Sequence, residues 1–398
     1  MNAESSPFHP GQPVPIEFFV GRTKEIERLR SMVKAARQGR LKIGFVSGER
    51  GIGKSSLVSF VRHLSEREEK AAGCHVLLGG VSTVPEMVRR TFDRLLKESI
   101  ERPWHAKLRE FFGKHVREVG LFGISLELAL QGKDIQTLTD GFVASLHSLL
   151  DRLQTERQVL LLILDDINGL ATSEYFANWL KSTVDDIATS GRRLPLCLLV
   201  VGLEERRREL VKSQPSLARV FELIEISPWD EGETRQFYLQ VFRSAGGALD
   251  PDALGHMVEA TGGLPVLAHE IGEAVWRRAR GGDIMLAEAV TGVMDAADVI
   301  GRKHLEPQVL QALRSPRYRS ILRKIAELPR GLEFRRAEVG QRLAPDERKV
   351  MDNFLRRMKD LGAIISDEES GPGGYRFPNH LHALYFWMES QRSRKGKA

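Results

Sequence analysis

The stretch GERGIGKS at residues 48–55 restricts the fold of this chain more than any other feature. It matches the pattern G-x-x-x-x-G-K-[ST] and lies between an apolar run and a helical segment, which is the context that the pattern requires. The glycines let backbone N–H groups curl around phosphates, and the N-terminus of the following helix adds a positive dipole. We therefore predict that Lys54 reaches the outer phosphates of ATP or ADP and that the Ser55 hydroxyl binds Mg²⁺. A chance match in a glycine-rich turn is the alternative. The predicted nucleotide-binding residues of the loop are Gly48, Glu49, Arg50, Gly51, Ile52, Gly53, Lys54, Ser55 and Ser56.

Two adjacent carboxylates, Asp165 and Asp166, follow the apolar run VLLLIL at residues 159–164. A metal ion that is bound to nucleotide phosphates needs a second anchor, and a carboxylate at the end of a neighbouring strand supplies it. We expect Asp165 to hold Mg²⁺ through water and Asp166 to polarise the attacking water. The alternative for either acid is a solvated strand end or a helix N-cap.

Five apolar runs alternate with helical sequence, which predicts an α/β fold with a RecA-like, five-stranded parallel sheet. The runs are KIGFVS (42–47), CHVLLGGV (74–81), VLLLIL (159–164), PLCLLVVG (195–202) and FELIEI (221–226). The alternation of VREVGLFGISLEL around Gly120 and Gly123 predicts an additional β-hairpin. Apolar residues at helical spacing after Lys24 predict a helix that ends near Gly39.

The pattern changes after the fifth run. The next 70 or so residues contain about four helical segments. The remainder predicts three helices, SPRYRSILRKIAEL (315–328), EFRRAEVGQRL (333–343) and PDERKVMDNFLRRMKDLG (345–362), and then two short strands around a Gly/Pro turn. Three helices and a hairpin form the winged-helix arrangement. The predicted organisation is a flexible lead-in at 1–16, a P-loop core at 17–229, a helical lid at 230–301, a winged helix at 302–390 and a basic tail at 391–398.

The formal net charge of +6 is unevenly distributed along the chain. Residues 302–398 contain 21 Lys and Arg against 12 Asp and Glu, a net +9, which leaves −3 for residues 1–301. Both cysteines lie in apolar runs, so we expect no disulfide framework and a reducing compartment. The sequence has neither an apolar stretch of the roughly 20 residues that a membrane helix needs nor a signal-peptide core, and we expect a cytoplasmic protein.

The segments GERGIGKSS, LLILDDI, FFVGRTKEIERL and TGGLP together resemble the AAA+ and STAND branch of the P-loop ATPases. The chain is most similar to the archaeal-type and origin-recognition-like ATPases, in which a winged helix follows a helical lid. The resemblance covers about residues 17–390 and implies the same three-part architecture.

The same resemblance implies roles for residues outside the phosphate loop. Val20, Gly21 and Arg22 would lie near the adenine, whereas the alternative is a core segment with a surface arginine. Pro265, in the sequence Gly263-Leu264-Pro265, would bring the lid to the adenine side, and a simple helix boundary is the alternative.

The resemblance also implies a catalytic role for Arg219. In such proteins an arginine just before the fifth strand reaches the nucleotide of a neighbouring subunit. An arginine that packs on the sheet edge or caps a helix is the alternative. Two positions depart from the family pattern. The fourth run ends in Gly202, where AAA+ motors usually carry a polar residue that senses the γ-phosphate, and Asp166 is one methylene shorter than the usual glutamate. Both departures predict slow turnover.

A helical face in the predicted winged helix consists of Val350, Phe354, Met358 and Leu361, which we expect to be core. The basic residues that are then free to face outward are Arg348, Lys349, Arg356 and Lys359, with Arg376 in the wing and further cations from Arg392 onward. This surface predicts contact with duplex DNA, although Asp352 and Asp360 dilute its charge. The alternative is an internal packing domain.

These features predict an ATPase that hydrolyses ATP slowly and acts as a nucleotide-dependent assembly switch. ATP would close the lid and favour a homo-oligomer, hydrolysis would reset it, and any effector activity would belong to a partner protein. One alternative is a DNA-loading or DNA-remodelling machine with DNA-stimulated turnover. The other is a non-hydrolysing scaffold that keeps a bound nucleotide.

Overall fold

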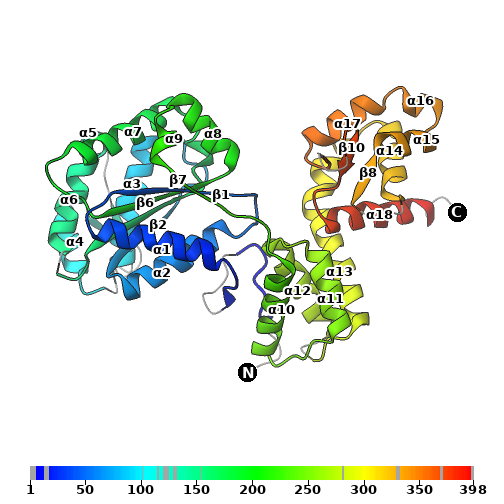
Figure 1. Cartoon of the computed structure of the whole chain (residues 1–398), viewed down its shortest axis with the longest axis horizontal. Helices are drawn as coiled ribbons and strands as arrows, with labels where there is room; N and C mark the ends of the chain where they lie inside the picture. The colour runs from blue at the N-terminus through cyan, green and yellow to red at the C-terminus, as the bar shows by residue number, and fades with distance from the viewer. Residues whose placement is uncertain are drawn as a thin grey trace. The chain divides into compact units, whose positions relative to one another are not determined.

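The computed structural model describes residues 6–12, 18–100, 102–113, 116–119, 125–128, 132–153, 155–279, 282–328, 332–367 and 371–395. The chain divides into two compact units. Pro13–Ser227 forms the first, and Met1–Gln12 together with Pro228–Ala398 forms the second. Figure 1 labels most of the elements of both units. No helix among the described residues is long and apolar enough to cross a membrane.

The first unit is built on a five-stranded parallel sheet, which confirms the predicted α/β, RecA-like core. Its strand order is β2-β5-β6-β1-β7. The strands are β1 (Lys42–Ser47), β2 (Ala71–Leu77), β5 (Val159–Asp165), β6 (Leu196–Gly202) and β7 (Glu222–Glu225). The second begins three residues before the predicted run because Ala71, Ala72 and Gly73 also pair with β5. All residues of β5 and β6 are buried, as continuous apolar runs require.

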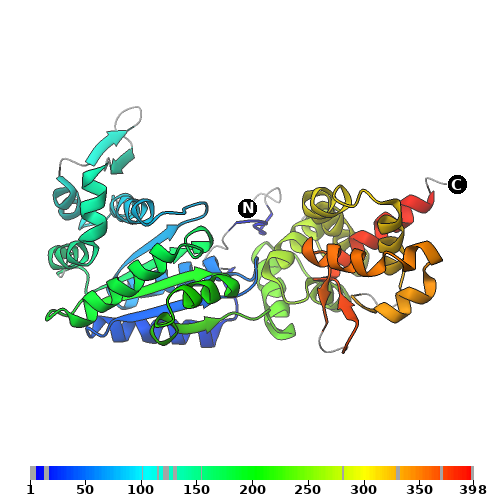
Figure 2. The ribbon, with the colours of Figure 1, turned by 90° about the horizontal axis from the view of Figure 1, so that it is seen from above.

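Helices cover both faces of this sheet (Figure 2). The connection from β1 to β2 runs toward the β2 edge of the sheet, whereas the connections from β2 to β5 and from β5 to β6 run away from that edge. Right-handed crossovers therefore place α2 on one face and α3 and α7 on the other. The helices of the unit are α1 (Thr23–Arg37), α2 (Lys54–Glu68), α3 (Val84–Ser99), α4 (His105–Phe112), α5 (Lys133–Asp140), α6 (Phe142–Leu153), α7 (Glu174–Thr189), α8 (Glu204–Ser213) and α9 (Leu217–Val220).

A small antiparallel hairpin is inserted between α4 and α5. It pairs β3 (Val116–Val119) with β4 (Ser125–Leu128), as predicted. Gly120 and Gly123, around which the alternation was centred, lie outside the described residues.

The carboxyl ends of four strands are level with one another. Ser47 of β1 is in register with Gly202 of β6, and Asp165 of β5 is in register with Val201 of β6 and with Leu77 of β2. Residues that follow these strands therefore gather at one edge of the sheet.

The second unit begins with the four predicted helices. They are α10 (Glu231–Ser244), α11 (Pro251–Thr261), α12 (Pro265–Ala279) and α13 (Leu286–Ile300). Asp230 caps the first through a reciprocal capping box with Glu233. The chain does not break at the predicted boundary between residues 301 and 302. It continues from α13 into a π-helical turn, Gly301–Leu310, and Gly301 lies so close to the Tyr385 ring that a Cβ there would be 2.0 Å from Cδ2.

The remainder of this unit has a core of its own and more elements than predicted. A three-stranded antiparallel sheet joins β8 (Glu333–Arg335), β10 (Gly374–Arg376) and β9 (Ile365–Ser366) in that order. The helices are α14 (Pro316–Ala326), α15 (Arg336–Arg342), α16 (Pro345–Arg348), α17 (Met351–Asp360) and α18 (His380–Lys395). Phe354 and Met358 are fully buried and Val350 and Leu361 are half-buried, as the predicted helical face requires.

Two parts of this prediction were wrong. Residues 333–335, predicted as the start of a helix, form β8, which pairs with β10. The predicted basic tail begins inside a helix, because α18 extends to Lys395. Within it, Arg392 forms ion pairs with Asp298 and Glu389, so its charge is balanced.

The predicted flexible lead-in is also partly ordered. Phe8 is 4% exposed and packs against the rings of Phe237, Phe242 and His269 in the second unit. The His9 N–H donates to His269 Nδ1 at 3.2 Å. The helix α12 admits the Phe8 ring because Gly272 has no side chain: a Cβ there would lie 2.1 Å from Phe8 Cε1. The N-terminal segment is therefore part of the helical core of this unit.

Candidate nucleotide-binding site

The phosphate loop connects β1 to α2, as predicted. Its glycines adopt backbone angles that side chains disfavour, with φ of 154° at Gly48, 77° at Gly51 and 93° at Gly53. A Cβ at Gly48 would also lie 2.9 Å from the carbonyl oxygen of Ile226. Glu49 and Arg50 are exposed, and Ser56 is buried inside α2. Lys54 and Ser55 form the first turn of α2, where unpaired backbone N–H groups attract anions.

Lys54 folds back onto the loop. Its ammonium donates to the carbonyl oxygen of Gly48 at 2.8 Å and to that of Glu49 at 2.7 Å. Burial lowers the pKa of Lys54, and the negative charges of Asp165 and Asp166 oppose this shift. The structure therefore brings the loop lysine within electrostatic reach of both predicted acids. A phosphate group could take over the hydrogen bonds that now go to the loop carbonyls.

Asp165 is 3% exposed at the end of β5, and its carboxylate has a partner that the sequence did not indicate. The Nε2 atom of His75, on the neighbouring strand β2, lies 2.8 Å from Asp165 Oδ2. One carboxylate oxygen is thus oriented by the imidazole, and the other remains for a metal ion or a water. Oxygen ligands of this kind and the hydroxyl of Ser55 suit Mg²⁺, which takes its remaining ligands from phosphates and water.

Asp166 differs from Asp165 in exposure and in backbone conformation. It is exposed and adopts a left-handed conformation, with φ of 60° and ψ of 56°, which is costly for a residue with a side chain. The amide of Asn168 donates to Asp166 Oδ1. This conformation turns the chain directly after the strand, so the two carboxylates do not alternate as they would in a continued strand.

The strand β6 ends at Gly202, so no side chain projects from its last residue. The nearest polar side-chain atom around a Cβ built at Gly202 is Asn168 Oδ1, at 3.8 Å. This oxygen is buried and has no hydrogen-bond partner among the described residues. Glu204, two residues further, is held by Arg207 and Arg208, which lower its pKa.

The segment before α1 contacts the back of the phosphate loop. Val20 and Arg22 are buried, and Gly21 and Arg22 both have positive φ. Arg22 Nη2 donates to the Ile52 carbonyl oxygen at 3.3 Å, and Arg22 Nη1 donates to the Ser227 carbonyl oxygen. Arg22 is therefore not a surface charge. It ties the loop to the segment that follows β7.

Arg219 lies on the short helix α9 and is exposed. It forms no ion pair with any residue in the described part of the chain. Pro265 is buried at the start of α12 in the second unit. The preceding Gly263 has a φ of 73°, and a Cβ there would lie 2.3 Å from the Trp229 carbonyl oxygen, so a glycine is required.

His75 and Asn168 are the two residues that sequence reasoning missed. His75 interrupts an apolar strand, which is a weak signal on its own. Its partnership with Asp165 follows from the register of β2 against β5, which no local pattern encodes. Asn168 could have been found from its position two residues after the paired acids.

Comparison with known proteins agrees with this geometry. Residues 19–202 match the family described as the AAA ATPase domain. A search of curated proteins found no match. Among solved structures, a Walker-type ATPase of Pyrococcus abyssi is similar with a TM-score of 0.57 and 18% identity, over 92% of this chain and 96% of that one. The ORC2 protein of Aeropyrum pernix, solved in ADPNP–ADP complexes, is similar with a TM-score of 0.57 and 16% identity, over 99% of this chain and 98% of that one.

At these identities the solved structures establish the fold, and the family match adds the domain type. With its phosphate loop between β1 and α2 and its paired acids at the end of β5, the segment of residues 19–202 is similar to the AAA ATPase domain family.

Proposed function

We propose that this protein is an ATPase that turns over slowly and uses ATP binding as a switch for assembly. The observation that carries the proposal is the meeting of Lys54, Asp165 and Asp166 beside a phosphate loop at one edge of a parallel sheet. ATP and ADP are the expected nucleotides, and the ORC2 relative was solved with ADPNP and ADP. Ser55 and Asp165 would hold Mg²⁺, which neutralises phosphate charge when it is bound.

Slow turnover is supported by the contact that occupies the proposed base, because Asp166 accepts a hydrogen bond from the amide of Asn168. Asp166 is also short, and a catalytic group that is misplaced by about 1 Å can cost on the order of a hundredfold in rate. In this proposal, Asp166 is the base that polarises the attacking water.

The rest of the chain would read out the state of the nucleotide. We assign residues 17–229 to the P-loop core, 230–301 to a helical lid and 302–390 to a winged helix. The box Val20–Arg22 and the Gly-x-Pro corner at Pro265 are the proposed adenine contacts. Because Arg22 bonds both the phosphate loop and Ser227, it is suited to link the nucleotide site to the chain that leaves this unit.

Assembly would complete the site in trans. Arg219 is exposed on α9 and is available to reach the nucleotide of a neighbouring copy. A trans arginine contributes 10³ to 10⁵ in rate in related phosphoryl-transfer chemistry. ATP would thus favour a homo-oligomer, and hydrolysis would release it.

Duplex DNA is the proposed partner of the winged helix. Arg348, Lys349, Arg356 and Lys359 are all exposed on α16, α17 and the turn between them. Arg336 is less available, because it pairs with Asp352 through two hydrogen bonds of 2.8 and 3.1 Å. Arg376 is half-buried on β10.

Turnover measured with and without duplex DNA tests this function. We expect kcat well below the ~10 s⁻¹ median for enzymes. Lys54→Ala should lose ATP binding, Asp166→Asn should keep binding and lose turnover, and a mixture of Lys54→Ala with Arg219→Ala should recover activity at hybrid interfaces. Turnover in the tens per second with DNA would favour the remodelling machine, and an absence of turnover under every condition would favour the nucleotide-bound scaffold.

A further inference from the structure

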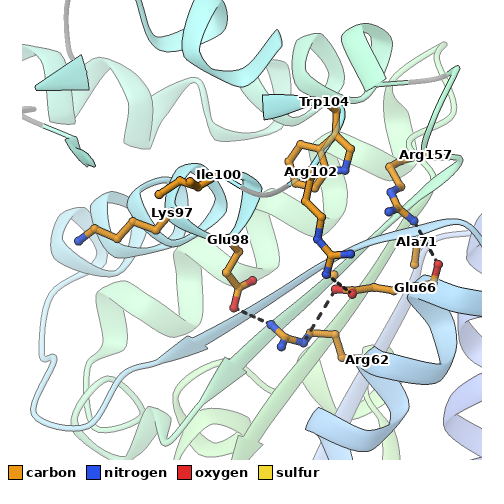
Figure 3. Close-up of a pocket in the computed structure, with 10 residues that line it drawn as sticks. Arg62, Glu66, Ala71, Lys97, Glu98, Ile100, Arg102, Trp104 and Arg157 are labelled. Atoms are coloured by element: carbon orange, nitrogen blue, oxygen red, sulfur yellow. Dashed lines mark hydrogen bonds and ion pairs between the residues drawn. The ribbon is translucent and has the colours of Figure 1, made fainter. Parts of the chain in front are cut away.

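A second pocket in the first unit lies away from the phosphate loop, at the outer edge of the sheet (Figure 3). It has a volume of about 520 Å³, which is within the range of small-molecule sites. Its floor is the start of β2, at Ala71 and Gly73, whereas the nucleotide site lies at the opposite, carboxyl end of the strands. Since β2 is the edge strand, the pocket opens where α2 on one face and α3 on the other leave the edge uncovered.

The walls of the pocket are rich in cations. Among the lining residues that the structure describes, four are basic, Arg62, Lys97, Arg102 and Arg157, and two are acidic, Glu66 and Glu98, so four charges against two leave a net +2. Trp104 and Ile100 add an apolar wall. An anionic ligand with a small apolar part is the chemical complement of such a lining.

Two ion pairs and one hydrogen bond to a carbonyl oxygen hold the three arginine side chains in place across the opening. Arg62 Nη1 donates to Glu98 Oε1 at 2.5 Å, which links α2 to α3. Arg102 Nη2 donates to Glu66 Oε2 at 2.9 Å, and Arg157 Nη1 donates to the Glu66 carbonyl oxygen at 3.1 Å. Figure 3 shows these three guanidinium groups converging around Glu66 from different elements. The site is thus preorganised before any ligand enters.

Gly73 makes this convergence possible. A Cβ at Gly73 would lie 2.5 Å from Arg62 Cγ and 2.6 Å from Glu66 Oε1, so the two side chains cross the strand where it has no side chain. A larger residue would push both of them out of the pocket floor.

Most N–H groups of the three arginine side chains donate no hydrogen bond to the described residues. Bonds to described residues take one N–H from each of the three guanidinium groups, and a guanidinium carries five. Arg62 Nε, Arg157 Nε and the indole Nε1 of Trp104 are buried without a hydrogen-bond partner among the described residues. Trp104 is only 4% exposed, so its orphaned N–H is costly unless it is satisfied by a ligand or a water. Burial lowers the pKa of Arg157, which also indicates a cation that lacks full compensation.

We propose that this pocket is a second ligand site that binds a small dianion, either a phosphate or a dicarboxylate, with Arg62, Arg102 and Arg157 as its donors. A dianion neutralises the net +2 of the lining, and its several oxygens match the unused N–H groups. The carboxylate of Glu66 competes with the ligand for Arg102, and the ligand would displace it. This site is independent of the nucleotide switch proposed above.

Calorimetric titration of the full chain tests the proposal. The titrants are inorganic phosphate and succinate at constant ionic strength. The protein is the Lys54→Ala variant, because inorganic phosphate would otherwise also enter the phosphate loop. We expect at least one of the two anions to bind, and the comparison of the two identifies the preferred oxyanion.

Two substitutions in this background should act in opposite directions. Arg102→Gln should weaken binding by about ten- to a hundredfold, because a charge-assisted hydrogen bond is lost. Glu66→Gln should strengthen binding, because it removes the competing charge. A variant that had lost its fold would bind the anion more weakly, so an increase in affinity distinguishes the expected effect from unfolding. Arg192→Gln is the matched control, since Arg192 is an exposed, ion-paired arginine of the same unit outside the pocket. The proposal is overturned if neither anion binds, if Arg192→Gln weakens binding as much as Arg102→Gln does, or if Glu66→Gln weakens it.

Discussion

The contact between Phe8 and Gly272 predicts that Gly272→Ala destabilises the protein when the Phe8 ring is present and stabilises it when the ring is absent. Truncating a buried phenylalanine to alanine costs about 3–5 kcal/mol, and Phe8 is 4% exposed among Phe237, Phe242 and His269. Because the N-terminal segment can detach instead of leaving a rigid cavity, we take the lower value, about 3 kcal/mol, for Phe8→Ala.

Gly272→Ala should cost nearly as much by a different route. The added Cβ would lie 2.1 to 2.5 Å from three atoms of the Phe8 ring, so the ring must leave its site. The loss of about 3 kcal/mol is reduced by the gain of about 1 kcal/mol from replacing glycine with alanine inside a helix, which leaves a net loss of about 2 kcal/mol. In a Phe8→Ala background the ring is already gone. Gly272→Ala should then stabilise the protein by about 1 kcal/mol, and the two residues have a coupling energy of about 3 kcal/mol.

Hydrogen exchange measured by mass spectrometry is the suitable assay, because it reports on α10 and α12 separately from the sheet of the first unit. The four proteins of the cycle are wild type, the two single variants and the double variant. The reasoning is refuted if Gly272→Ala destabilises α12 by the same amount with and without the Phe8 ring. Unchanged protection of α10 and α12 in Phe8→Ala would likewise mean that the segment does not dock.

Three further predictions concern the site, the partner and the pH. His75→Ala should raise the Mg²⁺ concentration for half-maximal turnover by about ten- to a hundredfold, since it removes the group that orients Asp165. The control His63→Ala should leave this concentration unchanged. Equal Mg²⁺ dependence in the wild type and both variants would contradict the role of His75. The logarithm of DNA affinity should fall with the logarithm of salt concentration, with a slope of about −4 for four phosphate contacts. Lys349→Gln should reduce the size of that slope by about 1, whereas Arg392→Gln should leave it unchanged because Arg392 is ion-paired. An anisotropy titration that finds no salt dependence would exclude this surface as the DNA contact. Burial and the neighbouring His9 lower the pKa of His269 to about 4, so the unfolded chain takes up the proton first as the pH falls. Urea unfolding should therefore find less stability at pH 5 than at pH 7, and the loss should be about 2 kcal/mol smaller in His269→Asn than in the wild type.

The parts of the fold that could be predicted are those with a long local signal. The strands β5 and β6 are buried on both faces and therefore read as uninterrupted apolar runs, and the phosphate loop carries its function in a contiguous motif. The roles predicted for Lys54 and Asp165 rest on the same kind of contiguous signal.

The missed parts depend on contacts between distant segments. The three residues of β8 are too few to show a strand period, and they pair only because β10 lies beside them. His75 gains its role from the register of β2 against β5, and Phe8 gains its role from a glycine 264 positions further along the chain, at Gly272. A proline-rich, polar context gave no sign that the phenylalanine would be buried.

The two cysteines have a practical consequence for measuring how the chain moves. Cys74 and Cys197 are the only cysteines of the sequence, and both are completely buried in the sheet. Burial raises the pKa of Cys74 and raises that of Cys197 to about 12, so neither thiol reacts readily with a maleimide dye while the protein is folded. A cysteine placed at Tyr175 on α7 and another at Leu239 on α10, which are 54% and 40% exposed, would then accept a donor and an acceptor fluorophore without removal of the native thiols. Energy transfer between these dyes would follow the separation of the two units through a cycle of nucleotide addition and release.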